Sequence, residues 1–352
     1  MAAARITIAV DAMGGDEAPR MVVRGVRLAA TRRPNVDFIL FGDEPALRPL
    51  AKRYRRVLGE RIRIVHTDDV VGAEDKPSVA LRRGRRSSMR LAIDAVGAGE
   101  ADALISAGNT GALMAMARLS LRMLPEIDRP AIAGVFPTRR GESVFLDLGA
   151  NIECDADNLV DFAVMGAVFA HTVLGRVDPT IGLLNVGYEE LKGHDELRQA
   201  AGRLREAENP PYVYHGFVEG DDLAKGTTDV IVTDGFTGNV ALKTAEGVSR
   251  LYGDFLKRAL RNSWRGRLGY LLARSAFHTL REKVDPRRHN GAMFLGVNGT
   301  VVKSHGGTDS LGFATAIEVA IDMVAGDVNV RMMEQLGRLH GKQQVDKAAA
   351  AS

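Results

Sequence analysis

Short segments rich in Gly, Asn, Asp and Thr recur along this chain, each directly after an apolar run. They are Asp11–Asp16, Ser106–Gly111, Asp147–Asn151, Asn185–Gly187 and Thr233–Asn239. Because ligands of open α/β sheets bind outside the carboxyl ends of the strands, these corners together predict one composite site at a common edge of the sheet. We call these five segments corners. A single one of them is common at a turn between a strand and a helix, so the prediction depends on the presence of all five.

The chemistry that these corners suit is the binding of a small anion. Loops that open a helix present backbone N–H groups and a positive dipole end, and Thr110-Gly111 and Thr237-Gly238-Asn239 are placed to do so. The chain has no G-x-x-x-x-G-K-[ST] and no G-x-G-x-x-G after a strand, which excludes a P-loop and a dinucleotide fingerprint. A phosphate-sized ligand therefore fits the pattern better than a dinucleotide.

Lysines near the corners are candidate cations for such an anion. Lys76 precedes Pro77-Ser78, Lys192 follows Gly187, and Lys303 begins the run Lys303-Ser304-His305-Gly306. Each lysine taken alone is more commonly a solvated surface charge than a ligand-binding group.

Other catalytic chemistries have little support in the sequence. Cys154 is the only cysteine, so no internal disulfide forms, a reducing compartment is expected, and a buried, inert thiol is the default. The eight histidines include no H-E-x-x-H or H-x-H pair, and no G-x-S-x-G is present. We expect no metal and no cofactor, although the Asp-rich corners leave Mg²⁺ coordination open.

The elements that would position these residues alternate between strands and helices. Helical periodicity is clear in Asn239–Leu260, whose apolar residues recur about every 3.6 positions. The expected strands are Ile6–Ala12, Val36–Phe41, Ile62–Val65, Ala103–Ser106, Ile132–Phe136, Val144–Leu148, Thr180–Val186, Tyr212–Phe217, Asp229–Thr233 and Phe294–Val302. The alternation predicts a three-layer α/β/α fold with a mostly parallel sheet.

The length of the chain allows two domains or one large α/β unit, and we expect one large catalytic domain over residues 1–345, followed by a disordered tail at 346–352. Of the 352 residues, 45% are hydrophobic and 26% charged, which is typical of a soluble globular protein with a sizeable core. The N-terminus lacks the features of a signal peptide. The longest apolar runs are shorter than the roughly 18 to 20 residues that span a bilayer.

Basic charge is concentrated near residue 270. Residues 251–288 hold ten Lys/Arg and three acidic residues, although the whole chain carries only +3. We expect a basic amphipathic helical protrusion at about 251–290, with Trp264, Leu268, Leu271 and Leu272 contacting an anionic membrane. The alternatives are a dimer interface or a pair of surface helices. An acidic carrier protein is a second possible binding partner for the same basic segment.

Read together, the corners match one known pattern. The chain resembles the bacterial fatty acyl-acyl-carrier-protein:phosphate acyltransferases of phospholipid synthesis, in the family's order from about residue 6 to residue 325. One departure is Arg85-Arg86, where an acidic residue is expected before the serines. The matching segments are Val10–Asp16, Lys76–Arg83, Ser106–Ala112, Leu183–Gly187, Thr233–Val240, Gly296–Gly299 and Lys303–Gly306.

The resemblance implies transfer of a long-chain acyl group from acyl-acyl-carrier protein to inorganic phosphate. The acyl phosphate would then serve glycerol-3-phosphate acylation by a membrane acyltransferase. It further implies a Rossmann-like α/β/α fold akin to phosphate acetyltransferases and isocitrate dehydrogenases, a homodimer, and a cytoplasmic, peripherally membrane-associated protein. Nucleic acid is not an expected partner.

Roles for individual residues are hypotheses from their positions. We expect a catalytic set of Lys192, Asn239, Asp234 and His305, in which Lys192 and Asn239 face the phosphate or the oxyanion, Asp234 orients donors and His305 protonates the leaving thiolate. The expected phosphate- and acyl-substrate-binding residues are Asp11, Gly14, Gly15, Asp16, Lys76, Ser78, Asn109, Thr110, Gly111, Asp147, Asn151, Thr237 and Gly238.

Rival interpretations differ in substrate. A phosphate acetyltransferase type of enzyme would move short acyl groups from coenzyme A, and chain-length preference separates it from the first hypothesis. An isocitrate-type dehydrogenase is disfavoured because no adenine-ribose acidic signature or metal triad is evident. A nucleic-acid-binding protein is disfavoured because the sequence has no RRM, zinc-finger or clear helix-turn-helix signature and few aromatic residues between the basic ones.

Overall fold

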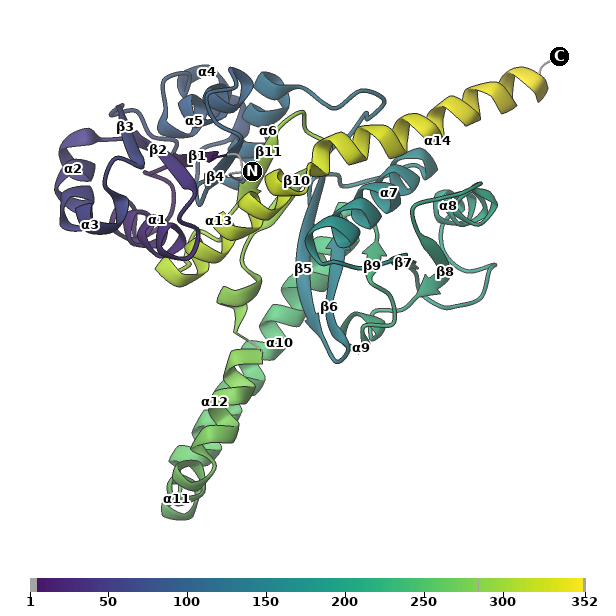
Figure 1. Ribbon diagram of the computed structural model, residues 1–352. Coiled ribbons are helices and arrows are strands. Elements are labelled where there is room, and N and C mark those ends of the chain that lie inside the picture. The colour runs from purple at the N-terminus through teal and green to yellow at the C-terminus, as the bar shows by residue number, and fades with distance from the viewer. Residues whose placement is uncertain (1–4, 284, 351–352) are drawn as a thin grey trace.

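The computed structural model describes residues 5–283 and 285–350 and forms one mixed sheet with helices on both faces (Figure 1). This confirms the predicted α/β class and the mostly parallel sheet. In spatial order the strands are β3 (Ile62–His66), β2 (Val36–Gly42), β1 (Ile6–Asp11), β4 (Ala103–Ser106), β11 (Thr300–Lys303), β10 (Ala292–Leu295), β5 (Ala131–Thr138), β6 (Gly141–Leu146), β9 (Val230–Val232), β7 (Thr180–Leu184) and β8 (Val213–Val218).

Strand direction reverses in the middle of the sheet. The strands from β3 to β11 are parallel to one another, and β6, β9, β7 and β8 form a second parallel block. Three antiparallel pairings, β11–β10, β10–β5 and β5–β6, separate the blocks, so the blocks run in opposite directions. The prediction of a common edge for all five corners is therefore wrong, because the corners after β1 and β4 lie opposite those after β6, β7 and β9.

The predicted strand Phe294–Val302 is also wrong, because it is a tight turn between two antiparallel strands. β10 ends at Leu295 and β11 begins at Thr300, with Met293 paired to Val302. Gly296 adopts φ +87°, a conformation that favours glycine and takes the chain out of β10. Apolar residues on both sides of the turn hide it from a search for continuous apolar runs.

Two sets of helices cover the sheet. One face packs against α1, α2, α3, α7, α8, α13 and α14; the other packs against α4, α5, α6, α9 and the start of α10. Their bounds are α1 (Arg20–Arg32), α2 (Glu44–Arg53), α3 (Arg55–Leu58), α4 (Pro77–Arg83), α5 (Ser88–Gly97), α6 (Thr110–Leu121), α7 (Ala156–Val173), α8 (Asp195–Glu206), α9 (Asp222–Lys225), α10 (Gly235–Arg261), α13 (Ser310–Ala325) and α14 (Val328–Ala350).

Polar caps begin the helices that matter most for the site. Asn109 accepts a hydrogen bond from the N–H of Ala112 (3.0 Å) at the start of α6, and Asp234 accepts one from the N–H of Thr237 (2.8 Å) at the start of α10. α7 opens with a capping box in which Asp155 and Asn158 satisfy each other's backbone N–H groups. These caps fix where each helix leaves its strand.

The second half of α10 leaves the sheet and, with α11 (Trp264–Leu272) and α12 (Arg274–Lys283), forms an arm that projects from the body (Figure 1). The chain returns through the 3₁₀ turn η1 (Pro286–His289) into β10. Among residues 5–283 and 285–350, no helix has both the length and the apolar character that crossing a bilayer requires. At the other end, α14 continues to Ala350, and 351–352 of the expected tail lie outside the described residues.

Helix α7 packs closely on the sheet at Gly166. A Cβ at this position would lie 2.6 Å from Val230 Cγ1 and 3.0 Å from Leu146 Cδ2. We expect Gly166→Ala to lower the free energy of unfolding by about 1–3 kcal/mol, because the added methyl overpacks the helix–sheet contact. Gly202→Ala on α8, where a Cβ meets nothing within 4 Å, should instead raise it by about 0.5–1 kcal/mol. Urea denaturation of both variants checks this, and equal effects would contradict the packing argument.

Candidate active site

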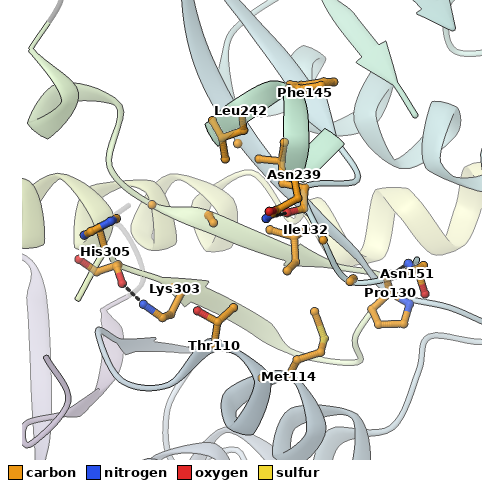
Figure 2. A pocket seen from close by; sticks show the side chains of 18 of the residues that line it. Thr110, Met114, Pro130, Ile132, Phe145, Asn151, Asn239, Leu242, Lys303 and His305 are labelled. Carbon is orange, nitrogen blue, oxygen red and sulfur yellow. Dashed lines mark hydrogen bonds between the residues drawn. The ribbon is translucent and has the colours of Figure 1, made fainter. Parts of the chain in front are cut away.

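A cavity of about 1050 Å³ lies over the centre of the sheet, on the face that α6 and α10 flank (Figure 2). Its floor consists of one face of the central strands, including Ile132 and Gly134 of β5, Phe145 of β6 and Ala292 of β10. Ala131 and Ala133 of β5 point to the opposite core, as the alternation of a strand requires. The floor lies between α6 and the start of α10, which flank these central strands on this side.

The middle of the cavity is apolar. Met114 of α6 and Leu242 of α10 face each other across the floor, and Leu148 and Phe136 extend the apolar surface (Figure 2). Large cavities with apolar walls and a few polar groups are the usual form of small-molecule sites. This part of the cavity suits a hydrocarbon chain better than a nucleotide.

One polar end of the cavity lies where β4 and β11 end. It contains Thr110 and Gly111 at the start of α6, Lys303 at the end of β11, and the following Ser304 and His305. Figure 2 shows Thr110, Lys303 and His305 at this end. The N–H of Gly307 donates to Nδ1 of His305 (3.1 Å), so the neutral ring carries its proton on Nε2. His305 is exposed, which leaves that Nε2–H group available to a ligand.

Lys303 is the most buried charged side chain of the cavity lining, with 7% of its surface exposed. Its ammonium donates to the carbonyl oxygen of the adjacent Ser304. Burial lowers the pKa of Lys303 to about 8, and the nearby Asp11 and Asp16 oppose this change. A lysine with this pKa is close to half protonated in mildly alkaline solution.

The second polar end is a loop held together by Asp147. This fully buried carboxylate accepts hydrogen bonds from the backbone N–H groups of Ile132 (2.9 Å), Gly149 (3.1 Å), Ala150 (3.0 Å) and Asn151 (2.8 Å). Burial raises the pKa of Asp147, and these hydrogen bonds counteract the rise. Asp147 thus shapes the end of the cavity without lining it.

Asn239 and Asn151 are the side-chain amides at this end (Figure 2). Nδ2 of Asn239 donates to the carbonyl oxygen of Leu148 (3.0 Å), which leaves its second N–H for a ligand. Nδ2 of Asn151 donates both to Pro130 O (2.7 Å) and to Asp147 Oδ2 (2.9 Å), so both of its hydrogens are occupied. Asn239 is therefore the better placed donor of the two.

Of the residues expected to act in catalysis or to bind phosphate and substrate, five line the cavity: Thr110, Gly111, Asn151, Asn239 and His305; Lys303, one of the three candidate cations, lines it as well. The others that were expected to touch phosphate or substrate lie outside the lining. They are Asp11, Gly14, Gly15, Asp16, Lys76, Ser78, Asn109, Asp147, Lys192, Asp234, Thr237 and Gly238.

Several of these outer residues support the lining. Asp11 accepts hydrogen bonds from Ser88 Oγ (2.6 Å) and Ser106 Oγ (2.7 Å), which ties β1 to α5 and β4. Nδ2 of Asn109 donates to the Ala73 and Asp75 carbonyl oxygens (2.9 Å each), so its amide holds the loop before α4.

Gly238 brings the start of α10 against the Asp147 loop. A Cβ at Gly238 would lie 1.9 Å from the carbonyl oxygen of Asp147, so only glycine allows this approach. Asp234 also bonds the hydroxyl of Thr237 (2.8 Å), so both residues serve the start of the helix. These contacts set the position of Asn239, one residue further on.

Lys192 lies outside the cavity lining in the segment after β7. Its ammonium is 3.3 Å from the Glu189 carboxylate, and half of its side-chain surface is exposed. Lys76 caps α4 from an exposed position, next to Ser78. The phosphate-binding role expected for Lys192 stays a prediction.

The four residues expected to contact a membrane are on α11, in the arm. Trp264, Leu268, Leu271 and Leu272 are all exposed, and Leu272 exposes 78% of its surface. They are separate from the cavity lining. The arm therefore presents an apolar surface that the catalytic chemistry does not explain.

Sequence reasoning missed the apolar part of the site and undervalued Lys303. Met114, Phe145 and Leu242 come from a helix, a strand and a second helix, and no local pattern connects them. For Lys303 a signal existed, because it directly follows the apolar Val301-Val302 at the end of a strand. Cys154 is not part of the cavity, and burial, with Asp147 and Asp234 nearby, raises the pKa of its thiol to about 12. Within the described residues, no group of His, Cys, Asp and Glu is arranged to hold a metal ion.

The fold resembles that of solved phosphotransacetylases. A phosphotransacetylase from Streptococcus pyogenes superposes with a TM-score of 0.61 at 18% identity, covering 91% of this chain and 94% of that protein. The EutD phosphotransacetylase from Staphylococcus aureus gives a TM-score of 0.56 at 18% identity, covering 90% and 94%. These likenesses define the class of fold.

Sequence comparison identifies the family. The family described as "Fatty acid synthesis protein" matches residues 6–331. Phosphate acyltransferase from Rhodospirillum centenum is 61% identical over 348 residues, covering 99% of this chain and 97% of the relative. Phosphate acyltransferase from Parvibaculum lavamentivorans is 57% identical over 337 residues, covering 96% and 93%. The chain belongs to the phosphate acyltransferase family, as its motifs indicated, and is an enzyme that transfers acyl groups to phosphate.

Asp147→Asn tests the loop at the second polar end. The amide places an N–H group against backbone N–H donors and removes an acceptor, so we expect the free energy of unfolding to fall by about 1–3 kcal/mol. Acyl transfer should fall as well, because Asn239 and the loop lose their shared support. Asp128→Asn, at a position with 80% of its side chain exposed, is the control and should change stability by less than about 0.5 kcal/mol. Urea unfolding and a rate assay on both variants check this, and a stable, fully active Asp147→Asn would contradict it.

Proposed function

We propose that this enzyme transfers a long-chain fatty acyl group from acyl-acyl-carrier protein to inorganic phosphate, giving acyl phosphate for phospholipid synthesis. The observation that supports this most is the cavity, which combines an apolar floor of Ile132, Phe145 and Leu242 with polar groups at both ends. Its volume of about 1050 Å³ is at the upper limit of the roughly 300–1,000 Å³ typical of ligand sites, which favours a bulky acyl donor.

In the proposed reaction an oxygen of HPO₄²⁻ attacks the thioester carbonyl carbon. The new C–O bond forms and the C–S bond breaks. The proton of HPO₄²⁻ is transferred to the thiolate sulfur, which leaves as a thiol. Phosphate is already a nucleophile, so orientation and stabilisation of the developing oxyanion are the main tasks of the protein. We assign the free N–H of Asn239 to the oxyanion and the Nε2–H of His305 to a hydrogen bond that stabilises the departing sulfur, which takes its proton from the phosphate.

A basic surface next to the cavity supports a carrier protein as the acyl donor. Leu81 of α4 lines the cavity, and the residues that follow it, Arg82, Arg83, Arg85 and Arg86, are exposed. An acidic partner that docks on these arginines would be held beside the cavity by charge complementarity. The Arg85-Arg86 pair that departs from the family pattern belongs to this surface.

The reaction is tested by measuring acyl phosphate formed from palmitoyl-acyl-carrier protein at varied phosphate concentration, without added metal. We expect product that saturates with phosphate and a higher kcat/KM for palmitoyl than for acetyl donors, because only the long chain fills the apolar floor. Turnover restricted to short acyl-coenzyme A would instead favour an acetyl- or butyryltransferase. Alanine variants of Lys192, Asp234, Asn239 and His305 with unchanged rates and unchanged phosphate saturation would remove each residue from the mechanism.

We propose two functions for the arm, homodimerisation along α10 and contact of α11 with an anionic membrane. Val248, Leu251, Tyr252 and Phe255 are exposed on α10, and a second copy of the chain would cover them. At the far end, apolar side chains of α11 lie among Arg265 and Arg267, a mixture that suits the interface of an anionic bilayer. Such contact would place the acyl phosphate near a membrane-bound glycerol-3-phosphate acyltransferase.

Trp264 reports membrane contact directly because it is the only tryptophan of the chain. We expect its fluorescence to shift to the blue with vesicles containing phosphatidylglycerol and to stay unchanged with phosphatidylcholine alone, since both charge and apolar burial contribute. The double variant Leu271→Ser/Leu272→Ser should weaken vesicle binding by about tenfold or more. Val177→Ser, at an exposed position in the loop before β7, is the control. Equal binding by both variants would exclude the tip of the arm as the contact.

A further inference from the structure

We propose that Lys303 is the cation that binds inorganic phosphate in the cavity, together with the start of α6. This proposal deepens the proposed function and rests on it for the identity of the anion. Lys303 ends β11 in the centre of the sheet, where it pairs with Ala292 of β10 and Ser106 of β4. Lys303 is 93% buried and lines the cavity, so its charge is largely shielded from bulk water.

The ammonium of Lys303 has unused donor capacity. It carries three N–H groups, and one of them donates a hydrogen bond to the carbonyl oxygen of Ser304. Within the described residues, no carboxylate forms an ion pair with it, whereas Lys243 on the cavity rim lies 3.3 Å from the Glu246 carboxylate. A buried cation without a counter-ion is costly, and an anionic ligand would relieve that cost.

Backbone groups beside Lys303 complete the anion site. Thr110 and Gly111 begin α6, a helix of 12 residues, and both line the same end of the cavity. The Asn109 cap satisfies the N–H of Ala112, so the cap leaves the preceding N–H groups of the first turn to a ligand. A phosphate at this point would meet the ammonium, these N–H groups and the positive end of the helix dipole.

The charged groups around Lys303 are Asp11 at the end of β1, Asp16 in the segment that follows, and the cavity-lining His305 and His289. Asp11 is occupied by Ser88 and Ser106, and His289 Nδ1 lies 3.1 Å from the Glu142 carboxylate. Asp11 and Asp16 favour the protonated form of Lys303 but lie outside the cavity lining. These two carboxylates therefore favour the positive charge of Lys303 without lining the space where the phosphate would bind.

The test is equilibrium binding of inorganic phosphate, measured by isothermal titration calorimetry without any acyl donor. We expect Lys303→Met to raise the Kd for phosphate about tenfold to hundredfold, as the loss of a charge-assisted hydrogen bond implies. Lys52→Met, on the exposed surface of α2, should leave the Kd unchanged. Thermal unfolding shows whether Lys303→Met is folded, and its Tm should equal or exceed that of the wild type because a buried charge is removed.

A second measurement, the pH dependence of phosphate affinity, uses the wild-type protein and does not depend on whether a variant folds. In the wild-type enzyme the affinity for phosphate should fall as the pH rises through about 8, where Lys303 loses its proton. Unchanged affinity in Lys303→Met, or weak binding in Lys192→Met alone, would overturn the proposal and, in the second case, assign the phosphate to Lys192. Wild-type protein that binds no phosphate would also overturn it. Phosphate binding that depends on Lys303, without acyl phosphate from any thioester, would contradict only the proposed acyl transfer.

Discussion

The reversal of strand direction at the centre of the sheet determines where this enzyme can have a site. Parallel strands need crossover connections, usually helices, which then cover the faces of the sheet. Antiparallel neighbours can be joined by tight turns, as in β5–β6 and β10–β11, and such turns supply no covering helix. The central strands therefore stay open on one face between α6 and α10, and this strip is the floor of the cavity. A fully parallel sheet with helices on both faces would have closed the same space.

The two ends of the cavity are stabilised in different ways. At one end a buried carboxylate, Asp147, gathers the backbone N–H groups of its own loop and of β5, and Gly238 allows α10 to pack against its carbonyl oxygen. At the other end a buried cation, Lys303, has no carboxylate partner among the described residues. At the first end, the Asp147 carboxylate has all of its hydrogen-bond donors within the protein, and it holds the loop in place. At the second end, we propose that an anionic ligand compensates the buried charge.

The sequence was sufficient for the fold class and for the family, because the corner motifs are local and occur in order along the chain. It was insufficient for the arrangement of the site. Asp147 and Asn109 have the residue types of ligand-binding groups, but their hydrogen bonds hold loops, and only tertiary contacts reveal that. The apolar residues across the β10–β11 turn predict a continuous strand, so the sequence does not reveal the reversal at this turn or the open floor beside it. Met114 and Leu242, from helices far apart in the chain, face each other only because of that reversal.

Helix α10 connects the cavity to the arm as one continuous element. Its first turns carry Asn239 and Leu242 into the cavity, and its 27 residues span roughly 40 Å toward α11. Apolar residues along the exposed part, Val248, Leu251 and Phe255, lead from the cavity rim toward the tip that we propose contacts the membrane. An acyl phosphate has a hydrocarbon chain that water does not solvate well, and one helix that joins the cavity to the tip of the arm would shorten the aqueous path between its formation and a bilayer. The same helix that forms a wall of the site thus offers a physical reason for the site to lie close to a membrane surface.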